Sequence, residues 1–282
     1  MATRGSALAR VQAERVVALL GVDAELVVVE TTGDKRPDTP IHAMGGTGVF
    51  VKEVQQAVMD GRADVAVHSA KDLPSEAAPG LVIAAVPERV DVRDALVGST
   101  LEDLPAGATV ATGSVRRRAQ LAALRSDLGF AELRGNMETR LAKGQAFDAI
   151  VVAAAALDRL GLADRITERL STTVMLPQVA QGALAVECRD DDDETRARLA
   201  AIDDVNAHRA VDAERAFLAE LGGGCDQPVG ALAHVSDAGI EIEGMVASAD
   251  GRVLVRETVR DADPETAGRA LAAALRYVEE IA

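Results

Sequence analysis

The sequence predicts an α/β protein with two larger lobes and a smaller C-terminal α+β domain. Apolar runs of strand type alternate with helical patterns through most of residues 1–200, an order typical of layered α/β structure. From about residue 204 the order changes to one helix, three strand-like runs and a closing helix. The change of pattern indicates a separate domain, and a chain of 282 residues is long enough to bury more than one core.

The first 88 residues carry the elements of the first lobe. Ser6 can cap a helix, and the runs ELVVVE (25–30) and DVAVHS (64–69) are typical of strands. Residues 49–61 have the apolar periodicity of an amphipathic helix. The second of these strands leads directly into the polar segment HSAKDLP.

Residues 92–176 repeat the strand-then-helix order and predict a second lobe. The runs DALVGS, ATVATGS, FAELRG and DAIVVAAAAL are its strand candidates. GALAVEC (182–188) is one more strand, and an acid-led helical pattern follows it to about residue 200. Residues 204–282 then form the third domain, whose first helix-to-strand turn contains Cys225.

The composition excludes several classes of protein. A net charge of −15 and a pI of about 4.7 argue against general binding of nucleic acid or anionic membranes. No apolar run approaches the roughly 20 residues of a membrane-spanning helix, and the N-terminal residues lack the pattern of a secretion signal. We therefore expect a soluble, cytoplasmic protein.

The cysteines and histidines do not predict a metal site. The four histidines lack metal-ligand spacing, and Cys188 and Cys225 form neither a CxxC pair nor a disulfide framework. Cys188 lies in an apolar run and is expected to be a core thiol. Cys225 follows three glycines in LGGGCDQPVG (221–230), which leave its sulfur approachable.

Cationic and hydroxyl side chains gather at four strand-to-helix junctions. The segments are ATRGS (2–6), HSAKDLP (68–74), TGSVRRRAQ (112–120) and LRGNMETR (133–140). Strand ends are where open α/β sheets bind ligands, and helix N-termini and guanidinium groups both favour anions. The pattern predicts a cleft for a multiply carboxylated or phosphorylated ligand, with Asp72 as the carboxylate among the cations.

Each junction taken alone also has a purely structural interpretation. Three consecutive arginines are often a solvated helix face, and Lys71 with Asp72 can be a surface ion pair that contributes little. Two other functions fit part of the pattern: a non-catalytic anion-binding protein with two lobes, and an enzyme that forms a Schiff base on Lys71. Neither accounts for the Gly-Gly-Cys loop of a third domain.

The chain resembles the porphobilinogen deaminase family, also called hydroxymethylbilane synthases, over essentially its whole length. Eight segments recur in the family's order and approximate spacing, which makes the resemblance highly specific. They are ATRGS, GVFVKE, ADVAVHSAKDLP, TGSVRRRAQL, LRGNMETRL, LDRLGL, LPQVAQGALAVECR and GGGCDQPVG.

The resemblance implies a fold and a reaction. Two lobes of the type II periplasmic-binding-protein kind would flank a cleft, with residues 1–88 and 182–200 in domain 1, residues 92–176 in domain 2 and residues 204–282 in domain 3. The enzyme would join four porphobilinogen molecules head to tail with release of ammonia, and then hydrolyse off the linear tetrapyrrole hydroxymethylbilane for tetrapyrrole biosynthesis. A monomer without a metal is implied.

The resemblance also implies the roles of individual residues. Cys225 would hold a dipyrromethane cofactor through a thioether, and Asp72 would be the catalytic carboxylate. The carboxylates of cofactor and substrate would be bound by Arg4, Ser6, Lys71, Thr112, Ser114, Arg116, Arg117, Arg134, Arg140 and Arg159. The sequence departs from the family at Thr47, where lysine is common, and at Ala156 and Ala180, where glycine is common.

Overall fold

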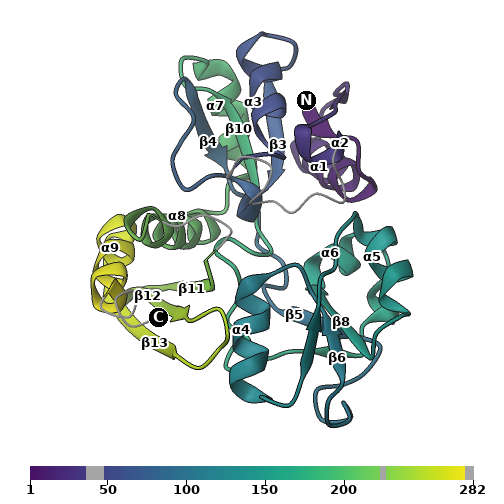
Figure 1. Cartoon of the computed structure of the whole chain (residues 1–282). Coiled ribbons are helices and arrows are strands. Elements are labelled where there is room, and N and C mark those ends of the chain that lie inside the picture. Colours follow the sequence, from purple (N-terminus) through teal and green to yellow (C-terminus); the bar gives the residue numbers. More distant parts are fainter. Residues whose placement is uncertain (36–47, 223–226, 277–282) are drawn as a thin grey trace.

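The first lobe is built on a five-stranded sheet of order β2-β1-β3-β10-β4. The computed structural model describes residues 1–35, 48–222 and 227–276 (Figure 1). β1 pairs in parallel with β2 and β3, whereas β10 runs antiparallel to both β3 and β4. The strands are β1 (Ala2–Arg4), β2 (Val27–Val29), β3 (Val65–Ser69), β4 (Leu81–Ala85) and β10 (Leu184–Arg189). The helices are α1 (Ala7–Leu20), α2 (Thr32–Lys35), α3 (Lys52–Met59), the 3-10 turn η2 (Ala70–Asp72), α7 (Asp193–Leu199) and the 3-10 turn η4 (Ala200–Ile202).

The second lobe repeats this sheet. Its order is β7-β6-β8-β5-β9, with β6 parallel to β7 and β8, and β5 antiparallel to β8 and β9. The strands are β5 (Asp94–Val97), β6 (Thr109–Ala111), β7 (Gly129–Ala131), β8 (Ala149–Ala153) and β9 (Glu168–Arg169). The helices are α4 (Val115–Leu124), α5 (Met137–Gly144), α6 (Ala154–Arg159) and the 3-10 turn η3 (Ala163–Arg165).

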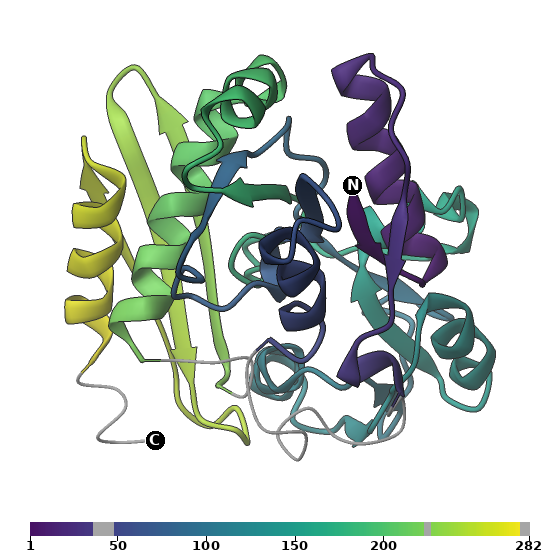
Figure 2. The ribbon, with the colours of Figure 1, turned by 90° about the horizontal axis from the view of Figure 1, so that it is seen from above.

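The third domain is a three-stranded antiparallel sheet packed on two helices. The strands β11 (Val229–Ser236), β12 (Gly239–Ala247) and β13 (Leu254–Asp261) lie in chain order, next to α8 (Val205–Glu220) and α9 (Pro264–Leu275). In Figures 1 and 2, α9 forms the outer edge of the molecule and α8 lies between α9 and the lobes. The predicted fold class, two α/β lobes and a small C-terminal α+β domain, is confirmed.

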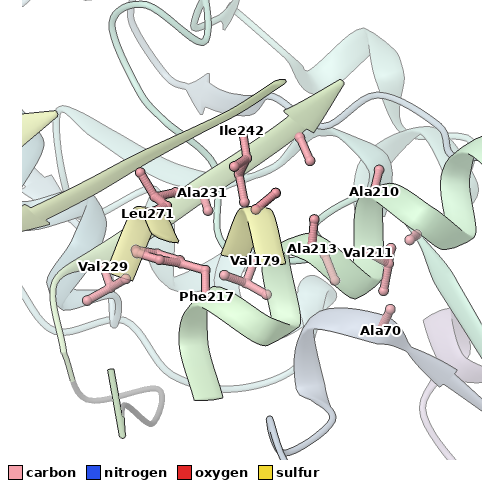
Figure 3. Close-up of a cluster of buried hydrophobic side chains, with 14 of the residues drawn as sticks. Ala70, Val179, Ala210, Val211, Ala213, Phe217, Val229, Ala231, Ile242 and Leu271 are labelled. Carbon is pink, nitrogen blue, oxygen red and sulfur yellow. The ribbon is translucent and has the colours of Figure 1, made fainter. Parts of the chain in front are cut away.

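The largest apolar core joins the third domain to the first lobe. Phe217, Leu271 and Ile242 are fully buried within it, and the same cluster includes Ala70 at the end of β3 and Val179 before β10 (Figure 3). A side chain at Gly268 would approach the Ala213 carbonyl oxygen at 2.3 Å, so α8 and α9 pack at a distance that only glycine allows there. The turn that carries Asp72 therefore packs, through Ala70, against the apolar core of the third domain.

Two chain segments connect the lobes, between β4 and β5 and between β9 and β10. The two segments run so close together that a Cβ atom added at Gly182 would lie only 2.7 Å from the Val90 carbonyl oxygen. Among the described residues other than glycine, Ala180 alone has a positive φ, of 59°. Its N–H donates a 2.6 Å hydrogen bond to Glu214 Oε2.

Glu214 joins these segments to the third domain. Its side chain is fully buried and accepts hydrogen bonds from Arg89 at 2.7 and 3.0 Å and from the Ala180 and Ala233 N–H groups. A buried carboxylate is stable only when it is paired in this way. One side chain of α8 thus fixes both connecting segments and strand β11.

We expect Ala180→Gly to leave the free energy of unfolding unchanged to within about 0.5 kcal/mol, although Ala180 is buried. An L residue in the left-handed region costs roughly 1–2 kcal/mol, and relief of this strain is offset by the greater freedom of glycine in the unfolded chain and by loss of the buried Ala180 methyl group. Urea unfolding followed by circular dichroism measures the change. Ala18→Gly, at an exposed position of α1, is the control and should lower stability by up to about 1 kcal/mol. A loss of stability in both variants would contradict the strain at Ala180.

Candidate functional site

Two adjoining cavities lie where the predicted site residues converge. The larger has a volume of about 890 Å³ and the smaller about 180 Å³. Both are lined by residues from the two lobes, and the smaller also extends to Leu218 of α8 and Val229 of β11. The residues that line both cavities are Lys71, Asp72, Arg117, Arg134 and Arg140.

The first lobe supplies Arg4 and Ser6 to the wall of the larger cavity. Ser6 caps α1, as the sequence predicts, and its hydroxyl accepts a hydrogen bond from the Ala9 N–H. The Arg4 guanidinium lies 4.2 Å from the centre of the Phe50 ring and donates to both carboxylate oxygens of Asp34. Burial alone would raise the pKa of Asp34, but hydrogen bonds from Arg4 and Thr31 outweigh it and hold the pKa below its usual value.

Lys71 and Asp72 lie on η2, the short turn that follows β3. Lys71 Nζ donates a hydrogen bond of 3.2 Å to Gln181 Oε1. Burial, and then the nearby Arg117 cation, lower the pKa of Lys71 to about 8, although Asp72 and Asp94 act in the opposite direction. Within the described part of the chain, no side chain or backbone group donates a hydrogen bond to the Asp72 carboxylate, which leaves it available to a ligand.

A fully buried carboxylate, Asp94, organises two of the predicted arginines. Arg116 donates to Asp94 Oδ2 at 2.7 Å, and Arg117 donates to Asp94 Oδ1 at 3.0 and 2.7 Å. Burial would raise the pKa of Asp94, but the charges of Arg116 and Arg117 hold it well below its usual value. Burial lowers the pKa of Arg116.

Arg116 and Arg117 are therefore not free surface cations. They are only 3% and 5% exposed, and both also donate to backbone carbonyls, Arg116 to Leu176 and Arg117 to Val151. Both nevertheless line the smaller cavity, whereas Arg116 Nε is buried and finds no hydrogen-bond acceptor among the residues that the structure describes. The solvated helix face considered from the sequence is wrong for these two residues.

Ser114 and Thr112 prepare the start of α4. The Ser114 hydroxyl caps the helix by accepting from the Arg117 N–H, and the Ser114 N–H donates to the Thr112 hydroxyl. Ser114 lines the smaller cavity, whereas Thr112 is buried and is not among the residues that line either cavity. The position of Thr112 supports the turn rather than the cavity surface.

The remaining predicted arginines line the cavities from the second lobe. Arg140 donates to the Gly135 carbonyl and Arg159 to the Gly182 carbonyl, each at 2.8 Å. Burial lowers the pKa of both arginines to about 10, and for Arg140 the nearby cations Arg117 and Arg134 add to the effect. Arg134 Nε lies 2.5 Å from Glu132 Oε1 in a geometry that does not satisfy it as a hydrogen-bond donor.

Sequence reasoning missed the groups that hold these cations. Asp94 is 22 residues from Arg116, and Gln181 is 110 residues from Lys71. Asp94 begins the strand candidate DALVGS and Gln181 lies in the segment LPQVAQGALAVECR, but neither pattern indicates a role for these two side chains. Arg215 of α8, also missed, lines the smaller cavity and donates to the Ser75 carbonyl at 3.2 Å. No pattern in the sequence around residues 205–220 pointed to this arginine.

Cys225 and Thr47 lie outside the described residues, so the predicted thiol is not placed. The nearest described residue after Cys225, Gln227, lines the smaller cavity together with Leu218 of α8. The chain therefore borders the cavity on either side of the Gly-Gly-Cys sequence. Asp72 lines this same cavity.

The cavity walls are cationic in an acidic protein. Basic side chains outnumber acidic ones among the lining residues, while the whole chain has a net charge of −15. The described ranges contain no group of histidines, cysteines and carboxylates that could hold a metal ion, and no helix within them is long and apolar enough to cross a membrane. The site suits a ligand with several carboxylates.

Known proteins match nearly the whole chain. The family described as "Porphobilinogen deaminase, dipyromethane cofactor binding domain" matches residues 1–197, and "Porphobilinogen deaminase, C-terminal domain" matches residues 208–277. Porphobilinogen deaminase of Roseiflexus sp. (strain RS-1) is 49% identical over 283 residues, covering 96% of this chain and 93% of the relative. That of Brevibacillus brevis is 46% identical over 285 residues, covering 97% and 92%.

Solved structures resemble the chain more remotely. The VFT2 domain of Bordetella pertussis BvgS aligns with 73% of this chain and 82% of that chain, at 20% identity and a TM-score of 0.36. An arginine-specific periplasmic binding protein of Salmonella typhimurium aligns with 67% and 78%, at 14% identity and a TM-score of 0.35. The two family matches together include both lobes and most of the third domain, and by these matches the chain belongs to the porphobilinogen deaminase family.

Proposed function

We propose that this chain is a hydroxymethylbilane synthase with Asp72 as its catalytic carboxylate and Cys225 as its cofactor anchor. The reaction joins four porphobilinogen molecules head to tail, releases one ammonia for each, and ends with hydrolysis of the linear tetrapyrrole. The observation that carries the assignment is the position of Asp72, an acceptor without a described donor, on the shared wall of two cation-lined cavities. Family membership supports the reaction.

The charge of the substrate accounts for the cationic walls. Each porphobilinogen carries an acetate and a propionate, so a growing chain accumulates negative charge. Charge-assisted hydrogen bonds from arginine forks are the strong and oriented contacts for such groups. We assign this binding to the predicted set, in which Thr112 supports Ser114 and the others face the cavities: Arg4, Ser6, Lys71, Ser114, Arg116, Arg117, Arg134, Arg140 and Arg159.

We assign the dipyrromethane to the smaller cavity. Arg116, Arg117, Arg134, Arg140 and Arg215 line this cavity and supply cationic groups for its carboxylates, and the described residues Leu218 and Gln227, on either side of the Gly-Gly-Cys sequence, border the same space. The Cys225 thiolate is a soft nucleophile that captures an electrophilic pyrrole methylene, and glycines permit the approach. When it is bound, the dipyrromethane supplies the pyrrole carbon to which the first substrate is joined.

Asp72 acts on the substrate. Loss of ammonia from porphobilinogen leaves a cation spread over the pyrrole and its methylene carbon, and a fixed carboxylate at the cavity wall stabilises it. The same oxygens accept hydrogen bonds from pyrrole N–H groups and take up the proton that is lost when each new bond forms. Lys71, the residue before Asp72, binds a substrate carboxylate while its ammonium group is protonated.

Membership of the family also suggests the domain boundaries, the oligomeric state and the location of the protein in the cell. We propose that residues 1–88 with 182–200, 92–176, and 204–282 are the three functional units, and that the protein is a cytoplasmic monomer. The composition of the sheets supports the first point, because β10 completes the sheet of the first lobe. Size-exclusion chromatography with light scattering tests the monomer.

Asp72→Asn should fold normally and turn over at least about a hundredfold more slowly, the scale for removal of a positioned acid–base group. The change keeps the shape of the side chain and removes its charge. Initial rates of ammonia release from porphobilinogen measure the effect. Asp237→Asn, at an exposed hairpin position, is the matched control and should leave the rate unchanged. Near-normal turnover of Asp72→Asn would refute the assignment.

Intact-protein mass spectrometry under denaturing conditions tests the anchor. Wild type and Cys188→Ala should carry excess mass equal to two linked pyrrole units, because Cys188 is buried in the first lobe. Cys225→Ala should carry none. A bare wild-type mass that persists after incubation with porphobilinogen or preformed hydroxymethylbilane would overturn the covalent cofactor and favour a non-catalytic anion-binding protein.

Lys71 should impose an alkaline limit on activity. Its pKa is lowered to about 8, so its cation is present below that pH and is lost as the pH rises through it. We expect kcat/KM for porphobilinogen to fall as the pH rises through about 8, and this fall to be absent in Lys71→Arg, whose side chain stays charged. An identical fall in both proteins would assign the limit to another group.

A further inference from the structure

Gln181 lies at the centre of the polar contacts between the lobes, yet it lines neither cavity. It belongs to the connecting segment between β9 and β10 and is 0% exposed. A buried amide must find partners for its oxygen and for both of its N–H groups. The identity of those partners shows what the side chain connects.

The side-chain amide of Gln181 has hydrogen-bond partners on both sides of the boundary between the lobes. On one side, Gln181 Oε1 accepts the 3.2 Å hydrogen bond from Lys71 Nζ, on the turn that carries Asp72. On the other side, Gln181 Nε2 donates to Asp94 Oδ1 at 2.9 Å and to the Val92 carbonyl at 2.8 Å. Ammonium groups only donate and carboxylates only accept, so the contacts fix the direction of the amide.

Asp94 extends this connection to the arginines. The oxygen that accepts from Gln181 also accepts from Arg117 Nε and Nη2, and the other oxygen accepts from Arg116. An unbroken series of hydrogen bonds therefore runs from Lys71 in the first lobe, through Gln181 and Asp94, to both arginines of the second lobe. The Gln181 carbonyl oxygen accepts from Arg89 Nε at 2.9 Å, and Arg89 pairs with Glu214 of the third domain.

We propose that Gln181 is a positioning residue, which sets the placement of Lys71, and with it the turn of Asp72, relative to Arg116 and Arg117 across the two lobes. It acts through Lys71 and Asp94 and touches no ligand. The side chain of glutamine is required, because one end must accept from an ammonium and the other must donate to a carboxylate. The proposal rests on the proposed function for its kinetic consequence, but its geometry is independent of it.

Two substitutions separate the contacts of Gln181. Gln181→Met keeps the length of the side chain and removes both sets of hydrogen bonds. Gln181→Glu keeps an acceptor for Lys71 but places a carboxylate against Asp94. Gln55→Met is the matched control, since Gln55 is also buried, donates to the Glu187 carboxylate and lines neither cavity.

The titration of Lys71 is the first readout. The chain has four lysines, so ¹³C-lysine NMR resolves them, and Lys71→Arg identifies the signal. Loss of the acceptor should move the Lys71 midpoint down by about one pH unit in Gln181→Met, because it removes a hydrogen bond that favours the charged form. The added charge should move it up in Gln181→Glu. Gln55→Met should leave it unchanged.

The kinetics give the second readout. A misplaced group in an active site costs up to about a hundredfold, so kcat/KM of Gln181→Met should fall about ten- to a hundredfold while Gln55→Met stays near wild type. The alkaline limit of kcat/KM should move in the same directions as the NMR midpoints. An unmoved Lys71 midpoint in both Gln181 variants would overturn the proposal. A shifted midpoint in a protein whose wild type releases no ammonia would retain the positioning role and reject the proposed function instead.

Discussion

The site depends on one buried carboxylate, that of Asp94. Arg116 and Arg117 stand next to each other on α4 and are almost fully buried, and two adjacent cations in such a place repel each other and lose their hydration. Asp94 offsets both effects with three hydrogen bonds and its charge. A wall rich in cations can therefore face a cleft because a carboxylate stands behind it, out of contact with the ligand.

The third domain sets the position of this machinery. Glu214 of α8 binds the connecting segments through Arg89 and Ala180, while the large apolar core holds Ala70, the first residue of the turn that carries Lys71 and Asp72. The lobes are thus fixed at the place where the chain crosses between them, and the cavity surfaces lie above that place. The hydrogen bonds of Glu214 hold the connecting segments, whereas the apolar packing of Ala70 holds the turn of Lys71 and Asp72.

Local signals in the sequence are sufficient for part of this structure. The Ser6 cap, the amphipathic helix near residues 52–59 and the strand before Lys71 follow from short patterns, and the structure contains them. The segment with three arginines also places cations at a cavity, as predicted. Each of these depends on residues that are near one another in the chain.

Contacts between distant residues could not be predicted in the same way. Strand β1 has only three residues, and β4 and β9 were likewise not recognised, since they gain their strand character from pairing with neighbours in the sheet. Asp94 is separated from Arg116 by 22 residues and Gln181 from Lys71 by 110, so no periodicity connects them. The sequence predicts that Arg116 and Arg117 bind ligand carboxylates. It does not indicate that both side chains also donate hydrogen bonds to Asp94.

The matching sheets of the two lobes have a consequence for the kind of molecule that the cleft can hold. β1 leads into a helix capped by Ser6, and β6, its counterpart in the second sheet, leads into a helix capped by Ser114. Each lobe thus presents a serine hydroxyl and a helix N-terminus to the cavities, beside Arg4 in the first lobe and Arg117 in the second. The same kind of binding element therefore occurs once in each lobe. A polymer of identical units has equivalent groups at regular intervals. Two equivalent binding elements can therefore each bind one unit of such a chain, whichever two units lie in the cleft.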